Sequence, residues 1–208
     1  MSQPPQLCVI GTSICFGAQE VSLESMAEAL TRYLRPERRT GRTLEIEQLA
    51  ADLPKHDFAD DEAMATFIRK VCWWGGYSGI SGRVLNPDHN APGTICARLR
   101  AAKAAMGEQP PNLQTAIREV RAIHSLGLSF ASKHLRMLWP EHCPVLDAQI
   151  HEHLGYPLNS TGYCAFAGDC RAVADFLGEQ KTPNPARDGQ SVWYVADVEA
   201  AVFMLLGR

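Results

Sequence analysis

Apolar residues recur every three or four positions along most of the chain, and this spacing predicts amphipathic α-helices. Met26, Leu30 and Tyr33, for example, share one helical face. The predicted helices span residues 22–34, 44–53, 60–74, 94–106, 113–125, 130–138, 163–177 and 193–206, and another begins at Asp147. The apolar run Leu7–Phe16 fits a strand or an extended segment. The pattern therefore predicts an all-α fold, with one short N-terminal strand left open.

Breaks between the predicted helices carry recognisable terminating residues. Thr94 and Asn112 stand where helix N-caps are expected, and the pair Gly75-Gly76 provides a stop after Trp74. Pro110-Pro111 interrupts the chain near its middle. A chain of 208 residues can bury a core as a single domain, 1–208, or as two helical lobes that divide at about residue 110.

Composition describes an ordinary globular chain, with 46% hydrophobic and 21% charged residues and a net charge of −3. No apolar run approaches 18 residues, so we expect no membrane span. The first six residues lack a basic region ahead of an apolar one, so we expect no signal peptide. Seven cysteines without a C-x-x-C pair indicate free thiols and a cytoplasmic protein.

The most suggestive chemistry is an amine and a carboxylate, Lys133 and Asp147, fourteen positions apart. Each is expected near a helix N-terminus, where partial positive charge favours a carboxylate and opposes an ammonium. A lysine that loses its proton is a nucleophile, and a fixed carboxylate beside it can take a proton or stabilise a cation. Two plainer roles remain open: Asp147 as a helix cap alone, and Lys133 as a surface or phosphate-contacting lysine.

Four sequence stretches resemble the bacterial OGG-fold family, the 8-oxoguanine DNA glycosylase-like proteins built on a helix-hairpin-helix. They are S-F-A-S-K-H-L-R-M-L at 129–138, P-V-L-D at 144–147, W-W-G-G-Y-S-G-I-S-G-R at 73–83 and W-Y-V-A-D-V-E at 193–199. In that family a lysine follows the hairpin and an aspartate opens a helix one loop later. Lys133 and Asp147 match these two positions. The family's Gly-x-Gly hairpin is replaced here by Gly127-Leu128-Ser129.

The resemblance implies a DNA N-glycosylase that needs no metal and no cofactor. It implies a base flipped out of double-stranded DNA, with Asp147 stabilising the cation on the sugar as the base leaves. Lys133 either attacks C1′ to form a Schiff base or leaves the attack to water. Members of the family act on 8-oxoguanine, and others on bulky modified cytosines in phage DNA, such as glucosylated hydroxymethylcytosine. We expect a monomer in an antiphage role, with 8-oxoguanine repair as the alternative.

Candidate base-pocket residues are aromatic or polar side chains near these motifs. Aromatic rings beside glycines can stack on an extruded base, although a tryptophan at a helix end is more often core packing. The predicted pocket residues are Trp73, Trp74, Tyr77, His134 and Gln149.

DNA contacts are predicted from local charge and from the hairpin. Residues 98–136 carry seven basic side chains against two acidic ones, although these need not share a face. The hairpin can offer backbone N–H groups to a phosphate. The predicted DNA-binding residues are Arg83, Gly127, Ser129, Ser132 and Arg136.

Two other classes of protein stay open. One is a helix-hairpin-helix DNA-binding module without catalysis. The other is a helical zinc protein that uses His142, Cys143, His151, His153 and the cysteines at 164 and 170, although His151 and His153 would face apart on a helix.

Overall fold

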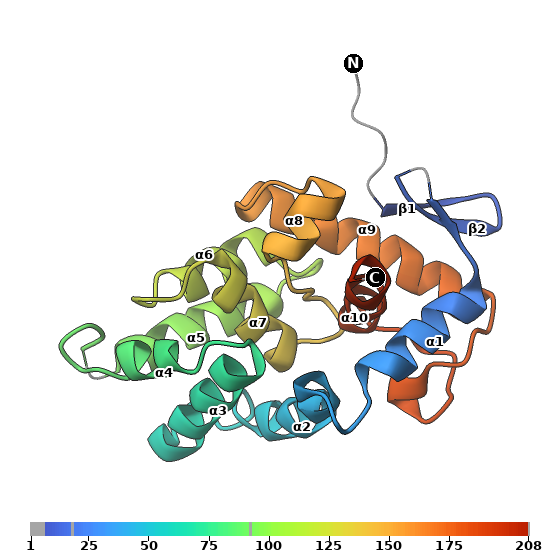
Figure 1. Ribbon diagram of the computed structural model, residues 1–208. Helices are drawn as coiled ribbons and strands as arrows, with labels where there is room; N and C mark the ends of the chain where they lie inside the picture. Colours follow the sequence, from blue (N-terminus) through green and yellow to red (C-terminus); the bar gives the residue numbers. More distant parts are fainter. Residues whose placement is uncertain (1–6, 18, 92, 208) are drawn as a thin grey trace.

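The computed structural model describes residues 7–17, 19–91 and 93–207, and most of these residues are helical (Figure 1). A small antiparallel sheet in the order β1-β2-β3 stands at one end of the molecule. The predicted all-α class is therefore confirmed at the level of a mostly helical chain, with three strands in place of one. Residues 1–6, on which the expectation about a signal peptide rests, lie outside the described residues.

The sheet is formed by β1 (Leu7–Ile10), β2 (Ser13–Phe16) and β3 (Gln19–Val21). Ile14 and Phe16 are buried, and the strand residues between them are partly open to solvent, as expected for a sheet with one covered face. Strand β1 packs against helix α9. The apolar run at 7–16 thus folds back on itself as a hairpin around Gly11, which has a positive φ of 60°.

Ten α-helices and two short 3-10 helices account for most of the remaining described residues. The α-helices are α1 (Leu23–Tyr33), α2 (Thr43–Asp52), α3 (Asp61–Trp74), α4 (Gly79–Val84), α5 (Thr94–Met106), α6 (Leu113–Arg121), α7 (Leu128–Leu138), α8 (Ala148–Leu154), α9 (Ser160–Glu179) and α10 (Val195–Leu206). The 3-10 helices are η1 (Arg39–Arg42) and η2 (Pro185–Arg187). None of these helices is long and apolar enough to cross a membrane.

Several predicted helix ends need correction. Thr94 is the first residue of α5, and the cap position belongs to Gly93. Helix α6 ends at Arg121, four residues before the predicted end, and α7 begins at Leu128, two residues before the predicted start. Asn112 and Asp147 do cap their helices, because each side chain accepts a backbone N–H.

Helix α10 lies in the middle of the molecule, and α1, α8 and α9 pack around it (Figure 1). Helices α2, α3 and α6 contact α7, which is buried along almost its whole length. One connected cluster of buried apolar side chains runs through residues 7–202. Elements from both sides of residue 110 therefore share this core, and the prediction of two lobes stays a prediction.

Five buried or half-buried charged side chains join α2, α7, α10 and η2. Arg136 is only 1% exposed, and its Nη1 lies 2.5 Å from Oε1 of Glu47. Arg187 lies 3.1 Å from the other Glu47 oxygen and 3.0 Å from Asp197. The Nε of Arg136 is 3.8 Å from Oε2 of Glu199. We call these residues the buried charge network; it ties three helices together where their apolar faces meet.

Loss of Arg136, the arginine at the centre of this network, should destabilise the fold strongly. We expect Arg136→Ala to lower the free energy of unfolding by about 3–5 kcal/mol, because Oε1 of the buried Glu47 then has no partner and only Arg187 remains paired with this carboxylate. In the matched control Arg98→Ala, loss of the exposed Arg98–Glu119 pair should cost less than about 1 kcal/mol. Urea denaturation of both variants measures the two values, and similar losses would contradict a dominant role for the network.

Candidate active site

Lys133 is held in a buried position on α7. Its residue is 7% exposed, and its Nζ donates to the Ser129 hydroxyl at 2.8 Å. The sequence predicted Lys133 near the start of its helix. Helix α7 starts at Leu128, so Lys133 stands in its second turn. Helical side chains lean towards the N-terminus, however, and the ammonium therefore reaches back beside the first turn. Gly75 leaves room for this lysine, since a Cβ there would lie 2.9 Å from Lys133 Cδ.

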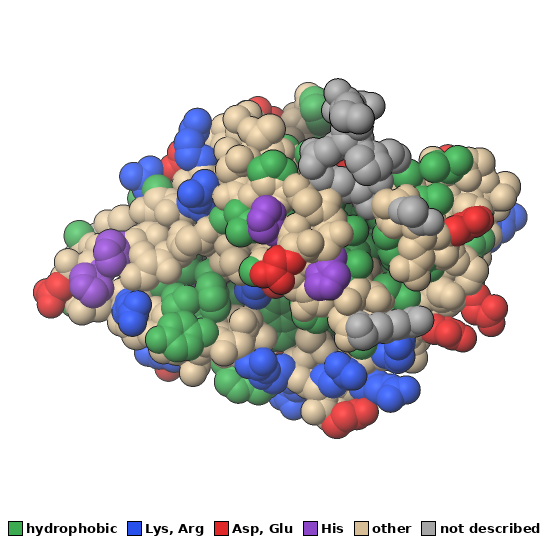
Figure 2. Space-filling view, turned by 45° about the horizontal axis from the view of Figure 1, so that its top comes forward, with side chains coloured by type: hydrophobic (Ala, Val, Ile, Leu, Met, Phe, Trp, Pro, Cys, Tyr) green, Lys and Arg blue, Asp and Glu red, His purple; other side chains and the backbone are tan. Residues whose placement is uncertain are grey.

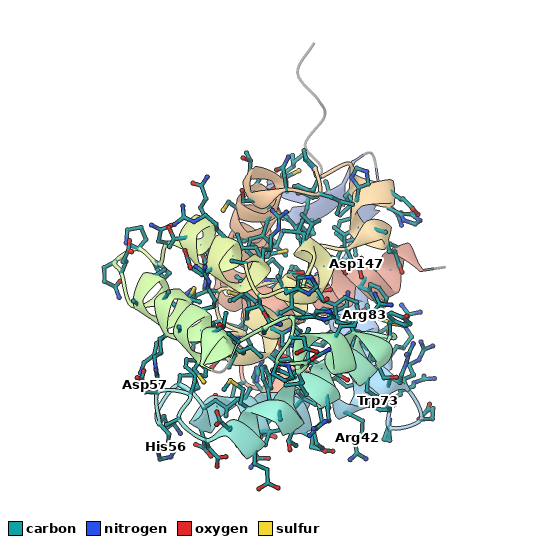
Figure 3. The ribbon with its side chains drawn as sticks, turned by 90° about the vertical axis from the view of Figure 1, so that its left-hand side faces the viewer. Arg42, His56, Asp57, Trp73, Arg83 and Asp147 are labelled. Carbon is teal, nitrogen blue, oxygen red and sulfur yellow. The ribbon has the colours of Figure 1, made fainter. Side chains whose placement is uncertain are left out.

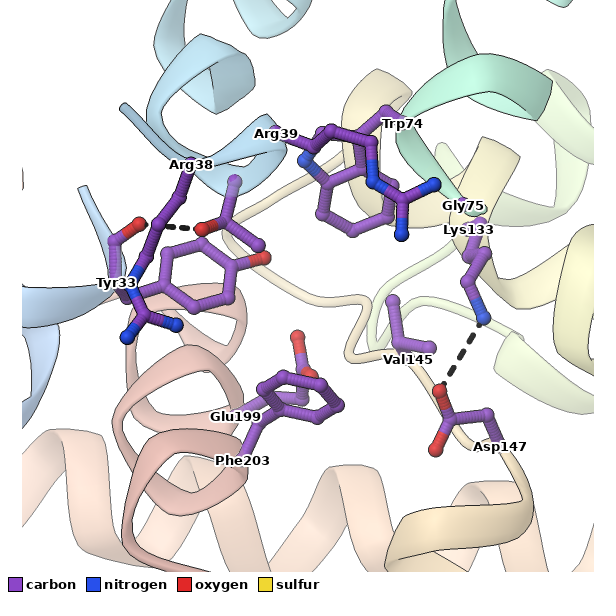
Figure 4. A pocket seen from close by; sticks show the side chains of 11 residues that line it. Tyr33, Arg38, Arg39, Trp74, Gly75, Lys133, Val145, Asp147, Glu199 and Phe203 are labelled. Carbon is purple, nitrogen blue, oxygen red and sulfur yellow. Dashed lines mark hydrogen bonds and ion pairs between the residues drawn. The ribbon is translucent and has the colours of Figure 1, made fainter. Parts of the chain in front are cut away.

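The two carboxylate oxygens of Asp147 form two different interactions. Its Oδ1 accepts the N–H of Ile150 and caps α8, while its Oδ2 lies 3.3 Å from Lys133 Nζ (Figure 4). The Ser132 hydroxyl accepts the N–H of Leu146 at 3.2 Å and donates to the Ser129 carbonyl at 2.9 Å. Ser132 thus fastens the loop before Asp147 to α7. This arrangement fixes the distance between the carboxylate and the amine.

The ion pair opens onto a pocket of about 340 Å³, within the size range of small-molecule sites. Its walls contain three aromatic side chains, Tyr33, Trp74 and Phe203, and Figure 4 shows Tyr33 across the pocket from Lys133 and Asp147. Trp74 is fixed by its indole N–H, which donates to Thr43 at 2.9 Å. The other lining residues are Arg38, Arg39, Thr40, Gly75, Val145 and Glu199.

Arginines stand at the mouth of this pocket. Arg38 and Arg39 line it, both are exposed, and neither forms an ion pair within the described part of the chain. They belong to the charged segment that connects α1 to α2, and the guanidinium of Arg39 lies beside Gly76, where a Cβ would be 3.2 Å from its Nη1. Unpaired guanidinium groups beside a pocket provide an electrostatic site for a phosphate or another anion.

Glu199 forms a buried part of the pocket wall. The residue is 2% exposed, and its Oε2 has no hydrogen-bond partner among the described residues. Burial raises the pKa of this carboxyl group to about 8; Asp147 also raises it, while Arg136 and Lys133 lower it. The site therefore contains one carboxyl group paired with a lysine and a second that favours its neutral form near pH 7.

Of the five predicted pocket residues, Trp74 alone lines the pocket beside Lys133. Trp73 points away and is 45% exposed in a separate groove with Arg42 and Lys70. Figure 3 shows Trp73 and Arg42 at one edge of the molecule. Tyr77 is 54% exposed and lies over Gly79. Neighbouring positions on a helix face different directions, so only one tryptophan of the pair can face the core.

His134 and Gln149 are also placed elsewhere. His134 is buried, its Nδ1–H donates to the Phe130 carbonyl at 2.7 Å, and its ring packs edge-on against Phe67. Gln149 donates to the Phe203 carbonyl at 3.3 Å and holds α8 against α10. Neither side chain lines the pocket in this structure. The prediction that they line the base pocket is therefore wrong for this pocket: both side chains pack helices together instead.

Some of the predicted DNA-binding residues are buried and others are exposed. Ser132 and Arg136 are buried at 0% and 1% exposure, so the prediction that they touch DNA is wrong. Gly127 is exposed just before α7, and Ser129 is half-buried with its hydroxyl turned to Lys133. Arg83 is exposed on α4 and is not among the residues that line the pocket.

The basic stretch at 98–136 does not form a free basic face. Arg98 and Arg118 pair with Glu119, and Arg100 and Lys103 pair with Asp57. Lysine, arginine and acidic side chains are interspersed on the face shown in Figure 2. Glu119 within the stretch and Asp57 outside it thus neutralise four of its seven basic side chains.

The cysteines and histidines of the zinc alternative are not gathered in the structure. Among residues 7–17, 19–91 and 93–207, no three His, Cys, Asp or Glu side chains form a group that could hold a metal ion. His151 and His153 instead contact the carbonyls of Tyr156 and Gln149.

Sequence reasoning missed Tyr33, Arg38, Arg39, Glu199 and Phe203. One of them had a local signal: Glu199 follows Val198 and precedes two alanines in a helix whose other residues, apart from Asp197 in the first turn, are apolar, so a charged residue there is unusual. The others reach the pocket from α1, the α1–α2 connection and the last turns of α10. Comparison with known protein families, with curated proteins and with solved structures finds no match for this chain.

His134 should make stability depend on pH. Burial lowers the pKa of this imidazole to about 4 from a usual 6.5, so between these values the unfolded chain binds a proton that the folded chain excludes. The stability that His134 contributes is complete above pH 6.5 and is lost as the pH falls through 4. We expect a contribution of about 1.4 kcal/mol per pH unit inside this window.

Urea denaturation between pH 4 and pH 7 tests this expectation. The His134→Gln variant should lack that part of the slope, whereas His56→Gln, at an exposed histidine, should keep the wild-type slope. The difference between variant and wild type isolates His134 from other groups that titrate in the same range. Identical slopes for both variants would contradict the assignment.

Proposed function

We propose that this chain is a helix-hairpin-helix DNA N-glycosylase whose active site is the pocket between α1, α3, α7 and α10. The observation that carries the proposal is the buried pair of Lys133 and Asp147, with Nζ and Oδ2 3.3 Å apart at an aromatic-walled pocket. A nucleophile and a carboxylate at this separation are suited to a reaction that builds positive charge on a sugar. Aromatic walls suit a flipped base.

Asp147 is placed for two roles in base release. Its Oδ2 faces the pocket beside the amine, where a carboxylate stabilises the cation that develops at C1′ as the bond to the base breaks. It can also accept the proton of Lys133. A neutral Lys133 then attacks C1′ and forms a Schiff base; in the second route, Asp147 activates water and an abasic site remains.

Double-stranded DNA is the proposed partner, held by the arginines at the pocket mouth. Arg38 and Arg39 are free of acidic partners among the residues that the structure describes, so they can neutralise phosphates on either side of an extruded nucleotide. The N-terminus of α7, which no side chain caps, is a second place for a backbone phosphate.

The proposed substrate is a bulky modified cytosine, such as glucosylated hydroxymethylcytosine, in the DNA of an invading phage. We expect a monomeric, cytoplasmic enzyme for this task. The alternative substrate is 8-oxoguanine in the cell's own DNA. A DNA-binding module without catalysis is the second candidate function, favoured by the cap that Asp147 provides to α8 in any case.

Base release should depend on Asp147 and covalent trapping on Lys133. We expect Asp147→Asn to lower the rate of release by about 10²–10⁴-fold, because an amide neither stabilises the sugar cation nor accepts a proton. Lys133→Gln should abolish borohydride trapping. End-labelled duplexes that each carry one modified base, and phage DNA with modified cytosines, provide the substrates; alkali reveals abasic sites.

Matched controls come from a second lysine–aspartate pair. Lys103 and Asp57 lie 3.2 Å apart at the surface, so Lys103→Gln and Asp57→Asn should keep wild-type release. Release that survives in Lys133→Gln would assign the attack to water. No release from any DNA by the wild type, with binding retained, would reject catalysis and favour the binding module.

The arginines at the pocket mouth should account for part of the affinity for DNA. We expect the double variant Arg38→Gln, Arg39→Gln to weaken binding to all sequences alike and to reduce the slope of log affinity against log salt by about 2. Arg100→Gln, at an arginine paired with Asp57, is the control and should keep the slope. Fluorescence anisotropy at several salt concentrations measures both, and equal slopes would place the DNA elsewhere.

A further inference from the structure

Glu199 is a carboxyl group that the proposed reaction does not use. It projects from α10 into the wall of the pocket, between the aromatic rings and the Lys133–Asp147 pair (Figure 4). Its Oε2 is buried, lacks a hydrogen-bond partner among the described residues, and lies 3.8 Å from Arg136 Nε. This separation is too long for a hydrogen bond, so Arg136 does not satisfy it.

The charges around Glu199 balance without it. In the buried charge network, Arg136 and Arg187 are matched by Glu47 and Asp197. At the pocket, Lys133 is matched by Asp147. Arg38 and Arg39 also line the pocket, but both are exposed to solvent. Among the buried groups, an ionised Glu199 would therefore add an unmatched negative charge, which is costly in free energy. A neutral carboxylic acid avoids that cost and has an O–H group to donate.

We propose that Glu199 acts as a neutral hydrogen-bond donor to the departing base, so that the pocket selects bases which turn an acceptor towards α10. This inference rests on the proposed function and deepens it. As the glycosidic bond breaks, the leaving base takes the bonding electrons and negative charge accumulates on its carbonyl oxygens and unprotonated ring nitrogens. A donor there stabilises the leaving group. Cytosine carries two such acceptors on one edge, O2 and N3.

The protonation state of Glu199 agrees with this role. Its pKa is raised to about 8 chiefly by burial, so the acid form predominates at pH 7. Asp147 raises this pKa further, whereas Arg136, Lys133 and a hydrogen bond from the backbone of Val145 lower it. The titratable and charged groups on the surrounding elements are Tyr33, Glu47, Lys133, Arg136, Asp147, Cys170, Arg187 and Asp197.

A pH profile of base release, with two substitutions, tests the inference. The full chain is assayed in single turnover on the duplex from which the wild type releases a base. We expect the wild-type rate to fall about tenfold between pH 7 and pH 9, as Glu199 loses its proton. Glu199→Gln keeps an N–H donor, so it should lose less than about tenfold at pH 7 and lack the alkaline fall. Glu199→Leu should lose about 100-fold or more.

The opposite pattern would overturn the inference. If Glu199→Gln is folded and inactive while the wild type is active, an ionised carboxylate is required; if Glu199→Leu is fully active, the side chain is not used. Gel shifts on DNA with an abasic site, which has no base, report whether each variant still binds DNA. Absence of base release by the wild type itself would instead reject the proposed glycosylase, and the inference with it.

A second measurement reads the protonation of Glu199 in the wild-type chain and does not depend on base release. Carbon-13 NMR of the wild-type chain, labelled at its glutamate carboxyl groups and assigned with Glu199→Gln, follows the titration of Glu199 directly. A midpoint near 8 is expected. A midpoint below 6 would mean that Glu199 is ionised at pH 7, and would contradict its role as a donor.

Discussion

Burial of the Arg136 guanidinium is the constraint on which the rest of the structure depends. A charge that is 1% exposed must be matched by acidic groups at hydrogen-bond distance, and Glu47 supplies the closest one at 2.5 Å. Glu47 stands on α2, and Arg187, which shares it, belongs to η2 and also holds Asp197 on α10. Helices distant in sequence must therefore meet at one point, and their apolar faces close around it.

This junction also forms the back of the pocket. Arg136 stacks under the ring of Trp74 with 5.6 Å between guanidinium carbon and ring centre, and Trp74 is one wall. Glu199 stands between Arg136 and the open space. Helix α7 carries both Arg136 and Lys133. The contacts that hold Arg136 therefore also fix the position of the Lys133 amine. A rigid support of this kind keeps the Lys133–Asp147 pair in place at little further entropic cost.

The helices were predictable because their signals are local. Periodic apolar residues, the cap at Asn112 and the cap at Asp147 each act within one or two turns, and the structure confirms them. The pocket was less predictable because its members meet only after folding. Arg136 reads as a surface charge in the sequence, and only Glu47, 89 positions away, turns it into a core residue. Arg38 and Phe203 come together only because α1 packs on α10.

Of the pocket residues, Glu199 is the one whose presence is explained least by a contribution to the stability of the fold. Replacement of a buried ionic group by an apolar side chain of similar volume is often neutral or stabilising, so a leucine there would satisfy the apolar surroundings of α10 equally well. The carboxyl group forms no hydrogen bond through Oε2 within the described residues, and its 3.8 Å separation from Arg136 is the longest in the buried charge network, whereas Asp197 accepts a hydrogen bond from Asn184 at 2.8 Å. Glu199 lines the same pocket as Lys133 and Asp147. A buried carboxyl group with so little pairing inside the fold, at the pocket where the chemistry is proposed, is better explained by what enters the pocket than by what surrounds it.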